Sequence, residues 1–134
     1  MKAPNYALAL ALAQAGWNNS ETARRINGRA VARGHPGVAV DRSRVSRWLR
    51  RGERPRPPVP ELIAELLSER LGQAYTPQRL GLAPPVSVLV PLDEHEHQAL
   101  AAHAAAANLP VEYYAQALIR LALSSPLQTG VGRV

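Results

Sequence analysis

The sequence contains no cysteine and no phenylalanine, and Lys2 is its only lysine. The absence of cysteine excludes disulfides, thiolate metal sites and cysteine nucleophiles. With only two Trp and four Tyr in 134 residues, a core has to be built from Ala, Leu and Val, which suits small helical modules better than a thick sandwich. The apolar fraction of 46% is too high for a wholly disordered chain. We therefore expect a mainly α fold, in one ordinary domain or two small ones.

The sequence also has no apolar run that approaches the ~20 residues of a membrane span. Its start imitates a signal peptide, with Lys2 before an apolar run over 7–13 and an A-x-A-like sequence after it. Leu8, Leu12 and Ala15 nevertheless share one helical face, which favours an amphipathic helix. We expect a cytoplasmic protein without a membrane partner, and a nucleoid-associated one if it binds DNA.

The charge is unevenly distributed. Residues 20–56 hold eleven arginines and three acids, a net charge of 11 − 3 = +8, within a chain of net charge +6. Residues 86–134 hold two arginines and four acids, a net charge of 2 − 4 = −2. Clustered positive charge is typical of a polyanion-binding surface. A solvated basic surface without a specific partner is the alternative.

The first part of the chain has the periodicity and punctuation of a helical domain. Gly16, the cluster Gly34-His35-Pro36-Gly37 and Gly52 are expected to end helices, and Asp41 is expected to cap one. Asn19 or Ser20 is the expected cap of the second helix. We expect helices over residues 4–15, 20–33, 41–51 and 60–71, with a fifth, short helical turn over 76–80. Domain boundaries are predicted as 1–82, a Pro-rich boundary at 83–85, 86–124, and a flexible tail over 125–134.

The stretch Asp41 to Pro57 contains seven arginines in seventeen residues. Val45, Trp48 and Leu49 fall on one face of a helix, while Ser43, Arg47 and Arg50 fall on the opposite face. A disordered basic arm has no need of a tryptophan at helical spacing from a valine. The pattern therefore predicts a helix with one buried and one basic face.

This helix and the one before it resemble the helix-turn-helix of lambda-repressor or XRE-type bacterial regulators, and "VDRSRVSRWLRRGERPRP" resembles their recognition helix. The resemblance covers about residues 4–82 and implies a five-helix domain, with a small residue at Ala23 where two helices cross. The connection "NGRAVARGHPGVAV" is longer than the family's turn of ~3–4 residues. Either the second helix is extended or a loop is inserted, and a wing-bearing variant remains open.

The expected DNA contacts divide by chemistry. An arginine fork can bond guanine O6 and N7 in the major groove, and serine can serve several bases. Arginines at the exit of the helix suit phosphates, which add affinity and salt dependence but little sequence information. The candidates for base readout are Arg42, Ser43, Arg44, Ser46 and Arg47. The candidates for phosphate contact are Ser20, Arg24, Arg50, Arg51, Arg54 and Arg56.

After residue 85 the period changes to two, which predicts a strand over 86–92, followed by helices over 93–107 and 111–124. This order resembles the ribbon-helix-helix family, and the resemblance implies an intertwined homodimer with a two-stranded ribbon. Ser87, Leu89 and Pro91 replace that family's usual polar readout residues, so we expect dimerisation without DNA contact. The candidate dimerisation residues are Val86, Val88, Val90, Leu92, Tyr114, Leu118 and Ile119. A monomeric helical hairpin is the alternative.

No residue pattern favours catalysis, a metal or a cofactor. His95, His97 and His103 lack the i,i+4 spacing of a helical zinc site, and no phosphate loop or nucleophile arrangement is present. The sequence predicts no enzyme but a homodimeric, sequence-specific bacterial transcriptional regulator that binds double-stranded DNA. A DNA-organising or segregation protein that binds repeated sites is one alternative, and an antitoxin-like module that binds a protein is another. The sequence does not identify the operator, the direction of regulation or a small-molecule or protein effector.

Overall fold

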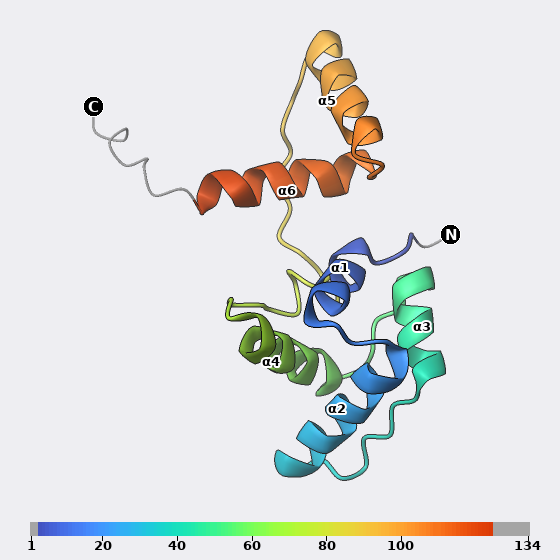
Figure 1. The fold of residues 1–134 in the computed structure, drawn as a ribbon. Helices are drawn as coiled ribbons and strands as arrows, with labels where there is room; N and C mark the ends of the chain where they lie inside the picture. The colour runs from blue at the N-terminus through green and yellow to red at the C-terminus, as the bar shows by residue number, and fades with distance from the viewer. Residues whose placement is uncertain (1–2, 125–134) are drawn as a thin grey trace, which may run out of the picture. The chain divides into compact units, whose positions relative to one another are not determined.

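The computed structural model describes residues 3–124, which form six α-helices and no strand. The chain divides into two compact units between Ser87 and Val88. The helices are α1 (Tyr6–Ala15), α2 (Asn19–Ala32), α3 (Arg42–Arg51), α4 (Val59–Leu71), α5 (Glu94–Ala106) and α6 (Val111–Leu123) (Figure 1). The prediction of a mainly α fold is confirmed.

Side-chain caps and glycines define most helix ends in the first unit. Asp41 accepts a hydrogen bond from the backbone N–H of Arg44 at 2.9 Å, as an N-cap does. Gly16 and Gly52 adopt the left-handed conformation that ends α1 and α3. These three predictions are confirmed. The predicted cap of α2 is wrong, because Asn18 is the residue that caps this helix, through a 2.8 Å bond from the N–H of Glu21.

The core of the first unit lies where its four helices meet. α2 packs on α3 and α4, and α1 packs on the same two helices. Ala23 is 6% exposed at the inner face of α2, so its small side chain lies in the packed interior. The largest fully buried side chains are Leu8, Ile26, Val45, Ile63, Leu67 and Leu80. This core belongs to one unit alone and includes residues from the first helix to the end of the unit.

The predicted count of five helices in this unit is wrong, but the short turn predicted over 76–80 is present: residues 77–81 form turns, and the N–H of Leu80 donates to the carbonyl of Thr76. The Oγ1 of Thr76 accepts a bond from the N–H of Arg79, but Gly81 in the left-handed region ends the segment before a helix can propagate. Asn5 holds this turn: its side chain donates to the carbonyl of Leu80 at 2.8 Å. The first unit is thus a four-helix domain closed by a turn.

The predicted strand over 86–92 is also wrong for this chain, because these residues are extended but belong to no sheet. Val86 and Leu89 are each 94% exposed. A strand requires a neighbour to accept and donate its backbone hydrogen bonds, and the described part of the chain offers none. The alternating apolar pattern alone does not create a ladder.

The second unit is a hairpin of α5 and α6. Asp93 and Glu96 form a reciprocal capping box at the start of α5. Asn108, with φ of 61°, turns the chain toward α6. Ala104 is the one buried residue of the two helices. The predicted flexible tail over 125–134 lies outside the described residues.

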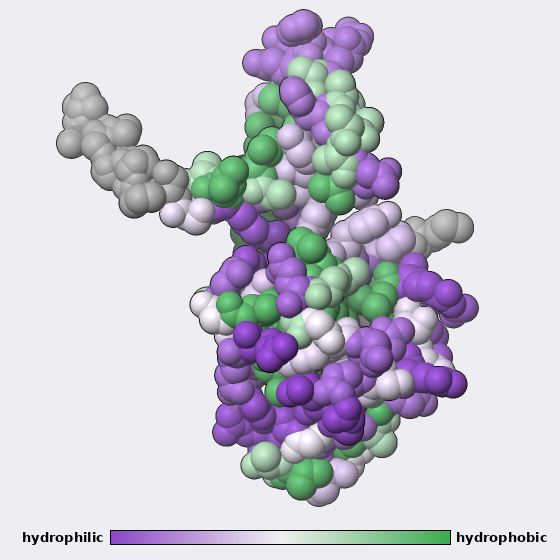
Figure 2. All heavy atoms as spheres, in the orientation of Figure 1, coloured by the Kyte–Doolittle hydropathy of each residue, from purple (hydrophilic) through white to green (hydrophobic). Residues whose placement is uncertain are grey.

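α6 is amphipathic and carries its apolar face at the surface. Leu118 and Ile119 are 44% and 53% exposed, and Figure 2 shows apolar residues at the surface over this helix. Gln116 and Arg120 lie on the side of the helix opposite Leu118. None of the described helices is both long and apolar enough to span a membrane.

Candidate nucleic-acid interface

α3 is anchored by its apolar face and presents its polar face to solvent. Val45 is fully buried and Trp48 is 4% exposed in the core. Among the base-readout candidates, Arg42, Ser43 and Arg44 are exposed, and Ser46 and Arg47 are half-buried. The helix therefore holds these five side chains on a rigid element with their polar ends accessible.

The phosphate candidates are exposed as well, but they do not share one environment. Arg50 and Arg51 occupy the last turn of α3, and Arg54 and Arg56 follow it in the exit segment. Ser20 and Arg24 lie at the start of α2, where Arg24 forms an ion pair with Glu21. Arg24 is thus already partly neutralised within the protein.

A single side chain fixes the connection between α2 and α3. The carbonyl oxygen of the Asn27 amide accepts a bond from the N–H of Val40, and its NH2 group donates to the carbonyl of Val40, both at 2.8 Å. The connection combines both alternatives left open by the sequence, because α2 continues to Ala32 and a loop then runs to Asp41. The clamp sets the position from which α3 begins.

A groove of about 560 Å³ runs beside α3. One wall is the loop over 37–40, and the other is the exit segment over 53–59. Between them, Arg44, Arg47 and Trp48 of α3 contribute side chains. The lining contains four arginines and one glutamate, so its formal charge is 4 − 1 = +3. This arrangement favours an anionic partner along the side of α3.

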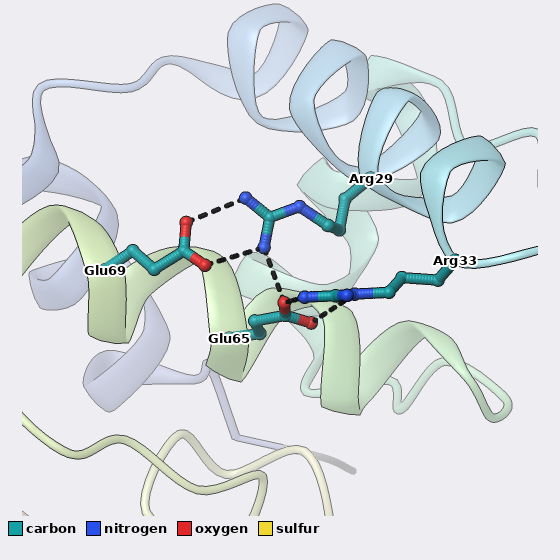
Figure 3. A network of polar contacts seen from close by, with 4 residues as sticks. All are labelled: Arg29, Arg33, Glu65 and Glu69. Carbon is teal, nitrogen blue, oxygen red and sulfur yellow. Dashed lines mark hydrogen bonds and ion pairs between the residues drawn. The ribbon is translucent and has the colours of Figure 1, made fainter.

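The arginines of α2 are compensated by acids inside the first unit. Arg29 forms bonds with both Glu65 and Glu69 of α4, and Arg33 pairs with Glu65 (Figure 3). The hydrogen bond from Arg33 holds the pKa of Glu65 below its usual value, and the hydrogen bond from Arg29 does the same for Glu69. These four side chains join α2 to α4, and their arginines are not free for a ligand.

Arg25 is also engaged within the unit. Its guanidinium carbon lies 4.7 Å from the centre of the Trp17 ring, and it forms an ion pair with Glu21. The three arginines of α2 and Arg33 at its C-cap are therefore each paired with an acid. Trp17 itself is buried at 8% exposure, which agrees with the core position of its ring.

The arginines of α3 and its exit are mostly uncompensated. Glu53 lies near two of them, at 3.4 Å from the Nε of Arg47 and 3.9 Å from an Nη of Arg51. Within residues 3–124, the other five have no ion-pair partner: Arg42, Arg44, Arg50, Arg54 and Arg56. The sequence did not distinguish these arginines from those of α2, because the acids that neutralise Arg29 and Arg33 lie more than thirty residues away on α4.

The candidate dimerisation residues divide between the extended segment and α6. Val86, Val88, Val90 and Leu92 are exposed at 43–94%. Leu118 and Ile119 are exposed, and Tyr114 is half-buried. These side chains therefore leave a large apolar area in contact with solvent in a single chain.

The described residues contain no group of three or more His, Asp or Glu side chains that could hold a metal ion. His95, His97 and His103 are all exposed on α5. The geometry brings together arginines and serines on α3.

Comparison with known proteins gives one match. Residues 8–83, more than half of the chain, match the protein-family model described as the SP15 N-terminal domain. The chain belongs to this family. The matched residues span α1 to α4 and the turn that closes the first unit, and so include the arginine surface of α3 and its groove. No curated protein and no solved structure matches the chain.

Proposed function

We propose that the protein is a homodimeric, sequence-specific DNA-binding transcriptional regulator with α3 in the major groove. The observation that supports it best is the contrast between two sets of arginines. The three arginines of α2 and Arg33 each have a glutamate partner, although Arg24 and Arg25 share one, whereas five of the seven on α3 and its exit have no ion-pair partner among the described residues. An uncompensated arginine surface on a helix anchored by Trp48 has the chemistry of a phosphate-binding and base-reading element.

In this proposal the surface has two tasks. Arg42, Ser43, Arg44, Ser46 and Arg47 contact base edges, where each good bidentate arginine–guanine pair supplies about 1–3 kcal/mol of discrimination. Arg50, Arg51, Arg54 and Arg56 contact phosphates, together with Ser20 and Arg24 at the start of α2. The groove beside α3 gives a path for one strand of the backbone between Arg44 and Arg56.

Dimerisation is assigned to the second unit. Its described part buries one helical side chain and exposes the apolar face of α6, which is too little burial for an independent fold of this size. A second copy would cover the apolar face of α6 and remove its exposed side chains from water. Joining two copies of the first unit in one dimer increases the affinity for DNA through effective concentration.

A second candidate function rests on the same apolar face. If another protein covers α6, the chain is an antitoxin-like module whose second unit binds that protein.

A DNA-organising or segregation protein would use the same arginine surface and differ in the number of its target sites. Both alternatives are decided by what the protein binds in solution.

The experiment that tests the proposal combines two measurements on the full chain. The mass in solution is determined by light scattering, and sequences bound from a random duplex pool are selected at moderate salt. A dimer that enriches a motif with two-fold symmetry supports the proposal. A chain that enriches no motif, while its binding falls steeply with salt, refutes sequence-specific reading and favours the DNA-organising alternative.

A further inference from the structure

Glu53 occupies an unusual place for an acid. It is the only acidic residue between Arg42 and Arg56, a stretch with seven arginines. Gly52, at φ 67° and ψ 21°, turns the chain in the left-handed conformation directly after α3. This turn brings residue 53 back beside the last turns of the helix, so its carboxylate lies among the arginine side chains.

The carboxylate bridges two arginines with different proposed tasks. One oxygen lies 3.4 Å from the Nε of Arg47, and the other lies 3.9 Å from an Nη of Arg51. The Arg47 side chain is 42% exposed, and that of Arg51 is 70% exposed. Glu53 therefore contacts the base-readout candidate more closely, and that candidate is also the more enclosed of the two.

The position of Glu53 lowers the general attraction of this surface for DNA. A carboxylate that faces the phosphate backbone is repelled by it, and it neutralises part of the charge that would otherwise release counterions. A surface that served only to hold phosphates would bind more tightly without it. The presence of an acid at this position is therefore better explained by its effect on the neighbouring arginines.

The geometry of the contact indicates what that effect is. The closest approach of the Glu53 carboxylate to Arg47 is to the Nε atom, at ion-pair distance, so the attraction acts on that edge of the guanidinium and the Nη donors lie farther from this carboxylate oxygen. A guanidinium held on one edge loses less rotamer freedom when its Nη groups bond the O6 and N7 atoms of guanine. The same carboxylate weakens the bonds that Arg47 would form with a phosphate in an unspecific complex.

We propose that Glu53 is a positioning residue that determines specificity, because it orients Arg47 toward a base edge and opposes binding to unspecific duplex. This inference rests on the proposed function, since it assumes that α3 reads DNA. Glu53 lowers the affinity of the protein for DNA of any sequence and raises the discrimination between sequences that Arg47 provides.

The test compares Glu53→Gln with the wild-type full chain on two duplexes, one selected by the protein and one of random sequence. Removing the carboxylate should tighten binding to random duplex about two- to fivefold at about 0.1 M salt. The ratio of specific to random affinity should fall about three- to tenfold. Glu53→Asp should restore part of the ratio, and Glu61→Gln, the same charge change at an exposed position of α4, should leave the ratio unchanged.

A double-mutant cycle with Arg47→Ala separates positioning from a general charge effect. If Glu53 acts through Arg47, Glu53→Gln should lower discrimination in the wild-type chain and leave it unchanged in the Arg47→Ala chain. An equal change in specific and random affinity, or a loss of discrimination that persists without Arg47, would overturn the inference while the proposed function stands. A wild-type chain that does not prefer any duplex would refute the proposed function and the role of Glu53 with it.

Discussion

The side-chain amide of Asn27 forms two hydrogen bonds with the backbone of Val40, one to its N–H and one to its carbonyl, each 2.8 Å long. Val40 is 6% exposed and directly precedes Asp41, the N-cap of α3. One polar side chain of α2 therefore ties the residue before the N-cap of α3 to α2. The long connection between the two helices is held at its far end and is not a free loop.

Replacing Asn27 by Ala should lower the free energy of unfolding by about 1–3 kcal/mol, because both backbone groups of Val40 lose their partner in a partly buried place. Urea denaturation followed by tryptophan fluorescence measures the change. Asn19→Ala on the same helix is the matched control and should change stability by less than about 0.5 kcal/mol. An equally small effect at Asn27 would mean that the clamp does not stabilise the connection.

Gly81→Ala should destabilise the first unit by about 1–3 kcal/mol. Gly81 has φ of +71°, and an added Cβ would lie 2.8 Å and 2.9 Å from the amide atoms of Asn5. Gly28→Ala is the contrasting variant, because it lies inside α2 with no atom within 4 Å of an added Cβ. It should stabilise the protein by about 0.5–1 kcal/mol. Thermal or chemical denaturation that ranks the two variants the other way would contradict the described packing of Asn5.

The ion-pair network between α2 and α4 should make stability depend on acid pH. The pKa of Glu65 is lowered in the folded protein, chiefly by the hydrogen bond from Arg33, and that of Glu69 chiefly by the bond from Arg29. A lowered folded pKa contributes stability above the unfolded pKa of about 4.3, and the contribution is lost as pH falls through the folded value. The pKa values of Arg29 and Arg33 are raised, so both stay charged throughout this range.

Glu65→Gln should therefore be less stable than the wild type near pH 7, and the difference should shrink near pH 2, where the carboxylates are protonated. Denaturant titrations at both pH values measure it. Glu61→Gln, at an exposed position of the same helix, should show little difference at either pH. A deficit for Glu65→Gln that stays constant down to acid pH would contradict the assigned origin of the stabilisation.

Several parts of the fold could be predicted from local sequence alone. Gly16, Asp41 and Gly52 act within one helical turn, so their neighbours suffice to identify them. The apolar stripe through Val45 and Trp48 was readable for the same reason. The role of Asn27 was not readable, because its partner lies thirteen residues away on an irregular segment.

The strand over 86–92 shows a different limit. Alternation of apolar residues reports which side chains seek burial, but a ladder requires a partner that the described single chain does not contain. The arginines show a third limit. Arg29 and Arg44 look alike in sequence, and the position of α4 separates the paired guanidinium from the exposed one.

If the chain dimerises as proposed, removing residues 86–134 should give a monomer that still folds, because the first unit has its own core. It should also bind half-sites more weakly, since bivalence is lost. Sedimentation or light scattering gives the mass, and fluorescence anisotropy gives the affinity. A truncated chain that remains dimeric would contradict the assignment of dimerisation to the second unit.

Point variants on α6 test the same division within the full chain. Leu118→Glu places a charge on the apolar face and should shift the equilibrium toward the monomer by at least tenfold, about 1.4 kcal/mol. Gln116→Glu adds the same charge on the polar side of α6 and should leave the mass unchanged. Equal effects of the two variants would mean that the apolar face of α6 does not form the dimer contact.

The most direct test of the central claim, that α3 reads DNA bases, compares Arg47→Ala with Arg54→Ala on a selected and a random duplex across a salt series. Arg47→Ala should reduce discrimination by about 1–3 kcal/mol, and Arg54→Ala should weaken binding to all sequences alike while lowering the salt slope by about one. Equal, sequence-independent losses for both variants would contradict the account, because α3 would then hold phosphates without reading the bases.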